Sequence, residues 1–133
     1  MSYQYAADLQ VAMFQALSND PALTHIPLFD APSVGTVPQT YMAIGAETVL
    51  GGSSKNSAGA EHKVSLSVVT QAQGFHGAKQ IAADAERVLA GMPGDAVGAG
   101  TIATVNFERA RARHGGPDNG RRIDLTFRVF IDG

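Results

Sequence analysis

Two segments of the chain place hydrophobic residues at helical spacing. In residues 5–17, Ala6, Leu9 and Met13 share one stripe at intervals of three and four, and Asn19, Asp20 and Pro21 follow as helix-ending residues. The second segment, residues 75–90, carries an apolar face made of Ala78, Ile81, Ala82, Ala85, Val88 and Leu89. Gly91 and Pro93 mark its end. The pattern predicts two amphipathic helices.

Other segments alternate hydrophobic and polar residues with the period of a half-buried strand. The strand-like segments are 41–49, a run that begins at Glu61, 101–113 and 122–131. Prolines around residues 26–29 allow only a short or edge strand there. Residues 51–60, 94–100 and 115–120 are rich in turn formers, and we read them as connections. We expect an α+β fold with an antiparallel sheet of about four to five strands and two main helices on one face.

The last two strands pose a register problem. Pairing Val105 with Val129 and Phe107 with Phe127 would put the following arginines on the apolar face of the hairpin. A one-residue bulge near Glu108 or Arg109 would turn the intervening alanines inward and the arginines outward. Alternatively, the end of the hairpin projects beyond the core.

Composition and charge narrow the candidate chemistry. The chain has 133 residues, which fits a single domain, and it has no cysteine, which excludes disulfides, thiolate metal sites and a cysteine nucleophile. The net charge of -2 gives no general attraction for nucleic acid. The first residues contain neither a basic signal region nor a long apolar run, so we expect no secretion signal and no membrane contact.

No motif for catalysis, phosphate binding or metal binding is present. The four histidines are His25, His62, His76 and His114, and their spacing matches no zinc motif. His62 lies on the apolar side of its strand, where a hydrogen-bonded structural histidine is favoured over a ligand. We therefore expect no catalytic residue, no cofactor and no metal, and we expect that the chain is not an enzyme.

The most informative local feature is the arginine row, which consists of Arg109, Arg111 and Arg113. These residues alternate with alanines and point to one side of a strand, where like charges repel unless partners neutralise them. Glu108, Asp118 and Asp124 can supply only part of that neutralisation. The row predicts a contact with another subunit or a polyanion, and a solvated edge face is the alternative.

Several stretches, taken in order, resemble the small tail-terminator or tail-completion proteins of long-tailed phages and phage-like gene transfer agents. The resemblance covers nearly the whole chain and includes the helix at 75–89. The other stretches are 11–23 (VAMFQALSNDPAL), 26–32 (IPLFDAP), 38–44 (PQTYMAI), 59–69 (GAEHKVSLSVV), 107–113 (FERARAR) and 121–127 (RRIDLTF). The match rests on their order and combination.

This resemblance implies a structural subunit that caps the tail tube and forms the head-tail joining surface, as a ring that is typically hexameric. The implied partners are copies of the chain, the tail tube protein and a head-side connector or stopper, with DNA passing through the lumen without sequence-specific binding. The implied location is the bacterial cytoplasm during assembly and then the head-tail junction of the particle. The arginine row is a candidate for contacts between subunits or, alternatively, for the lumen wall.

The glycine-rich and serine-rich loop at 51–60 is a second candidate interface, because ordering it alone is entropically costly. We expect it to lie against the tail tube or a neighbouring subunit. Its candidate residues are Gly52, Ser53, Ser54, Lys55 and Asn56.

Two other functions stay open at this point. One is a small oligomeric α+β enzyme or ligand-binding protein whose intersubunit pocket uses His62, Tyr41 and an arginine of the row, because such sites leave no linear motif. The other is a nucleic-acid-binding module built on the arginine row. The acidic balance and the few aromatic residues argue against this second function.

Overall fold

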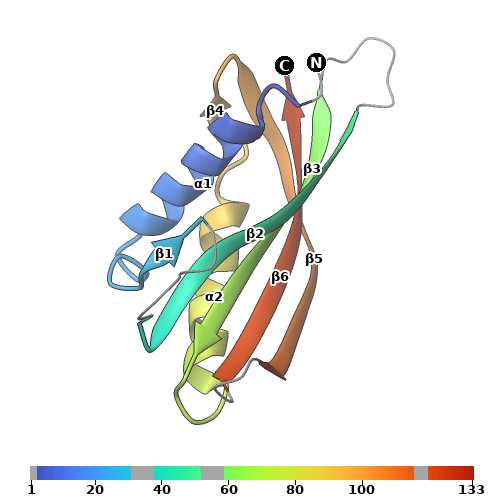
Figure 1. The fold of residues 1–133 in the computed structure, drawn as a ribbon. Coiled ribbons are helices and arrows are strands. Elements are labelled where there is room, and N and C mark those ends of the chain that lie inside the picture. Colours follow the sequence, from blue (N-terminus) through green and yellow to red (C-terminus); the bar gives the residue numbers. More distant parts are fainter. Residues whose placement is uncertain (1–2, 31–37, 52–58, 116–119) are drawn as a thin grey trace.

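The computed structural model describes residues 3–30, 38–51, 59–115 and 120–133. Within these ranges, two helices and six strands form an α+β fold (Figure 1). The elements in chain order are α1 (Ala6–Asn19), β1 (Leu28–Phe29), β2 (Thr40–Gly51), β3 (Ala60–Thr70), α2 (His76–Ala90), β4 (Ala96–Val97), β5 (Gly100–Gly115) and β6 (Gly120–Asp132).

The strands form one twisted sheet in the order β1-β2-β3-β6-β5-β4. Both helices cover the same face of this sheet, and α1 runs from β4, beside its N-terminal end, to β1, beside its C-terminal end (Figure 1). Neither described helix has the length and apolar character needed to span a lipid bilayer. The expectation of an α+β fold with two helices on one face is confirmed.

The expected strand number and purely antiparallel pairing are wrong. The sheet has six strands, and β1 pairs with β2 in parallel through Leu28 with Met42 and Phe29 with Ala43. The segment at 94–100, which we read as a connection, contains β4. Strands of two residues have no alternation that a sequence pattern can reveal, because one side chain per face is not a period.

One hydrophobic cluster lies between the sheet and the helices. From α1 it takes Leu9, Met13 and Leu17, which are almost fully buried. From β6 it takes the alternating residues Ile123, Leu125, Phe127, Val129 and Ile131. The alternation predicted for β6 is therefore confirmed, and it makes the helix-free face of β6 the polar one.

Candidate interaction surface

A β-bulge at Glu108 decides which side chains β5 presents on each face. Phe107 pairs with Phe127, but Arg109 pairs with Thr126, so Glu108 is the extra residue on β5. Beyond the bulge, Ala110 lies opposite the buried Leu125, on the helix side. The predicted register and the predicted bulge are both confirmed, and the bulge sends the arginine row to the helix-free face.

Asp124 of β6 ties one end of the arginine row to the sheet. Its carboxylate accepts hydrogen bonds from Arg113 at 3.2 and 3.3 Å, from Arg122 at 2.7 Å and from the Ser67 hydroxyl at 2.6 Å. Arg122 also donates to Ser67 Oγ at 3.1 Å. Because Arg113 and Arg122 are cross-strand neighbours, the carboxylate offsets the repulsion between them.

The surroundings of Asp124 favour its ionised form. Partial burial of this carboxyl opposes ionisation, but the hydrogen bond from Ser67 and the contacts with Arg122 and Arg113 outweigh it and lower the pKa below the ordinary 3.8. Ser67 itself is only 4% exposed, so its hydroxyl depends on this acceptor. Sequence reasoning named Asp124 as a partial neutraliser and missed its central position.

A second ionic cluster surrounds the bulge. Glu108 forms ion pairs with Arg128 at 2.7 Å and with Lys63 at 3.0 Å, and Arg128 also lies 3.8 Å from Glu61. The hydrogen bonds from Arg128 and Lys63 lower the pKa of Glu108. The bulge residue is thus held on the helix-free face by partners on β6 and β3.

Arg109 and Arg111 differ from Arg113. Both are exposed, and neither forms an ion pair with any residue in the described ranges. They stand on a strand whose outer side is largely open, because β4 pairs only with Gly100 and Thr101 of β5. The described part of the chain therefore presents an open strand edge that carries two unneutralised guanidinium groups.

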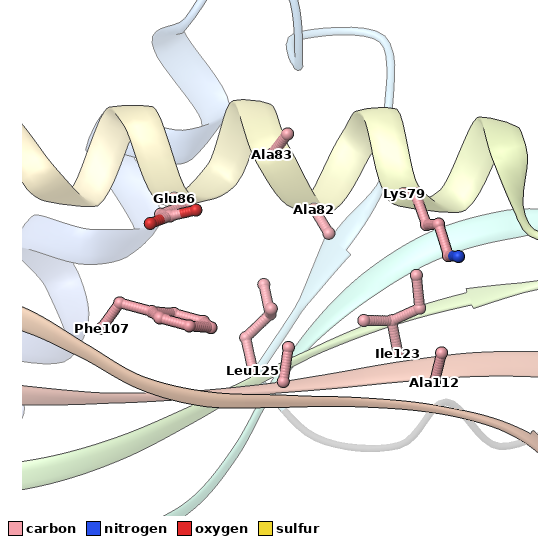
Figure 2. A pocket seen from close by; sticks show the side chains of 9 residues that line it. Lys79, Ala82, Ala83, Glu86, Phe107, Ala112, Ile123 and Leu125 are labelled. Atoms are coloured by element: carbon pink, nitrogen blue, oxygen red, sulfur yellow. The ribbon is translucent and has the colours of Figure 1, made fainter.

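The other side of β5 borders an apolar hollow of about 280 Å³, the α2–β5 groove (Figure 2). Its lining comes from α2 (Lys79, Ala82, Ala83, Glu86), from β5 (Phe107, Ala110, Ala112) and from β6 (Ile123, Leu125). Phe107 is 46% exposed, although its ring meets Phe127 edge-on with centroids 5.9 Å apart. The strand pattern places Phe107 toward the core, and only the position of α2 leaves it open.

A second exposed apolar region lies on α1. The α1 outer flank consists of Gln10, Val11, Phe14 and Gln15, and together with Asp30 it borders a hollow of about 260 Å³. Val11 is 54% exposed and Phe14 is 37% exposed. The sequence analysis assigned these residues no role, because a helix stripe identifies the buried side and leaves the outer side unexplained.

The structure does not bring together the residues of the hypothetical enzyme site. His62 is fully buried on the helix side of β3, with Nδ1 3.4 Å from a carboxylate oxygen of Glu47. Tyr41 neighbours the buried Met42 and so points to the other face, where its ring meets Phe29. Among the described residues no three His, Cys, Asp or Glu side chains gather as a metal site would require.

The other candidate interface cannot be placed. Gly52, Ser53, Ser54, Lys55 and Asn56 lie outside the described residues. The strands on either side of them, β2 and β3, are paired up to Gly51 with Ala60.

Comparisons with known proteins agree with the sequence resemblance. The family model described as "Tail completion protein gp17" matches residues 11–132. A chain in the structure titled "Virion of native gene transfer agent (GTA) particle" is similar, with 37% sequence identity and a TM-score of 0.85. The similarity covers 99% of this chain and 100% of that one. The comparison with curated proteins gave no match.

Proposed function

Because the chain belongs to the tail completion protein gp17 family, we propose that it caps the tail tube of a phage-like particle and forms the surface to which the head joins. The resemblance to tail-completion proteins is thereby confirmed, and with it a structural part in a phage-like tail. The observation that carries the proposal is the likeness, over the full length of both chains, to a chain in a gene transfer agent virion.

The proposed working form is a closed ring, with the hexamer as the expected size. Its partners are copies of the chain, the tail tube protein and a head-side connector or stopper. DNA passes through the lumen without sequence-specific binding. Assembly takes place in the bacterial cytoplasm, and the finished ring stays at the head-tail junction. We also propose that the chain is one domain, which agrees with a family match over most of its length.

Both candidate interfaces remain part of this proposal. The open edge of β5 supports a contact for Arg109 and Arg111, since two exposed guanidinium groups without partners are suited to carboxylates on another protein. Gly52, Ser53, Ser54, Lys55 and Asn56 are proposed to order against the tail tube or a neighbouring subunit. Catalysis has no part in the proposal, because the task is to hold surfaces together.

The test is to delete the gene in a strain that produces the particles and to examine the products by electron microscopy. We expect DNA-filled heads and separate tails in place of joined particles, and we expect a plasmid copy to restore joining. A labelled, functional copy should lie at the head-tail junction. Normal joined particles from the deletion strain, or a label only in the baseplate or head, would contradict the proposal.

A further inference from the structure

The α2–β5 groove leaves core-type surface uncovered. Its floor is formed by Ile123 and Leu125 of the hydrophobic cluster, and its exposed wall includes Phe107. Ala110 and Ala112 are exposed even though they lie on the helix side of the sheet. Larger side chains at these two positions would fill the hollow. The alanines leave room there for the side chains of a partner. A contiguous apolar surface rimmed by polar groups marks a contact site in soluble proteins.

The α1 outer flank offers side chains of a suitable kind. The buried residues Leu9 and Met13 fix which side of α1 meets the core. At 100° per residue, Val11 and Phe14 then lie away from the core, where they share a hollow with Asp30, the residue that follows β1. The groove lies by β5, toward the opposite edge of the same sheet (Figure 1). One copy of the chain thus carries exposed apolar side chains on α1 and an apolar hollow between α2 and β5.

Acidic and basic residues are distributed unevenly along the chain. The first 54 residues contain four acidic residues and no lysine or arginine. Asp20 is paired with Arg87 and Glu47 with His62, whereas Asp30, beside the α1 outer flank, forms no ion pair among the described residues. The rim of the groove carries Lys79, which is exposed and forms no ion pair among the described residues. Asp30 beside the flank and Lys79 at the groove are therefore complementary in charge.

We propose that the α2–β5 groove of one copy receives the α1 outer flank of a second copy. This inference rests on the proposed function, in which copies of the chain work as an assembly. Phe14 and Val11 of one copy pack against Phe107 and the exposed alanines of the next, and Asp30 approaches Lys79 at the rim of the groove. Because the two surfaces differ, each added copy exposes a new groove, and such head-to-tail contacts close into a ring when the rotation allows.

Cross-linking provides the first test, because the natural chain contains no cysteine. The variant carries Val11→Cys and Ala112→Cys, both at exposed positions, and a short bis-maleimide is applied to the purified chain and to assembled particles. We expect a ladder of covalent multimers beyond two copies. Either cysteine alone should give no multimer. Absence of the ladder in both samples, or dimers from a single cysteine, would overturn the proposal.

A mixing experiment tests the head-to-tail arrangement independently. Phe107→Glu blocks the groove and Phe14→Glu blocks the flank, and each alone should lower the yield of multimers at least about tenfold. An equal mixture should recover a complex of two copies and nothing larger, since one intact groove and one intact flank remain. Tyr3→Glu, at a 67% exposed position outside both surfaces, is the matched control and should assemble normally. Multimers from either blocked variant alone, or no two-copy complex in the mixture, would refute the arrangement.

The outcome for this inference is separable from the outcome for the proposed function. If the labelled chain lies at the head-tail junction but neither sample gives the ladder, the subunit contact is wrong and the function stands. If the chain is absent from the junction, the proposed function fails, and the ladder from the purified chain alone decides the contact.

Discussion

Replacing Arg109 and Arg111 by alanine separates assembly from folding. Both side chains are exposed and without ion pairs in the described part of the chain, so their removal takes away no intramolecular partner. Neighbours two residues apart on a strand lie about 7 Å apart, where like charges in water repel by roughly 0.6 kcal/mol before salt screening. The substitution relieves this repulsion. We therefore expect the free energy of unfolding to change by less than about 0.5 kcal/mol per site.

The effect on joining should be larger. An interface that brings carboxylates to these two guanidinium groups loses charge-assisted hydrogen bonds, and we expect joined particles to fall about tenfold at moderate salt. The assays are thermal unfolding of the purified variant and counting of joined particles by electron microscopy. The Arg109→Lys, Arg111→Lys variant is the matched control and should recover part of the joining, because it keeps both charges but lacks the two-pronged geometry.

Two results would refute this reasoning. A loss of more than about 2 kcal/mol in the free energy of unfolding would mean that the arginines stabilise the folded chain. Joining at the natural frequency would mean that they meet nothing during assembly. Arg113 is not replaced in this variant, because Arg113→Ala would also remove the ion pair with Asp124 inside the chain.

Four further predictions concern stability. Asp124→Ala should cost about 2 kcal/mol, measured by urea unfolding, because the buried Ser67 hydroxyl loses its acceptor; Asp124→Asn should cost less, and equal costs would contradict this account. The folded-state pKa of Asp124 lies below the ordinary 3.8. The contribution of its carboxylate to the free energy of unfolding is therefore present above pH 3.8 and is lost as the pH falls through the lower, folded-state pKa. The natural chain and Asp124→Asn should thus converge in stability in acid. Phe127→Ala should lower the free energy of unfolding by about 3–5 kcal/mol with an unchanged urea m-value, because the ring is 1% exposed in the core. A loss below about 1 kcal/mol would show that the surrounding side chains close the cavity freely. Deleting Glu108 should lower Tm far more than Glu108→Ala does. Only the deletion removes the bulge, and it turns the side chains on one side of the bulge to the wrong face of the sheet. Similar melting curves for the two variants would disprove this role of the bulge.

The sequence alone was sufficient for the longer elements and for one detail of register. Both helices and the four long strands were predicted from periodicity, because the side chains that face the core recur at 3.6 or 2 residues wherever an element has several turns or pairs. The bulge at Glu108 followed from a conflict of faces, since Phe107 and the arginine row cannot share one side of a regular strand. The two-residue strand β4 escaped prediction because it is shorter than any period, whereas β1 is the short edge strand that the prolines allowed around residues 26–29.

The interaction surface depended on tertiary structure. The sequence identified the arginine row, but the cross-strand position of Asp124 decides that Arg113 is bound while Arg109 and Arg111 are not. Likewise, the pattern that marks Phe107 as apolar is silent on whether a helix covers it. That coverage depends on where α2 lies across the sheet, which is set by the packing of the whole core. The order of hydrophobic and polar residues therefore determines the elements and their faces, whereas the surface left open for a partner is decided only when those elements pack.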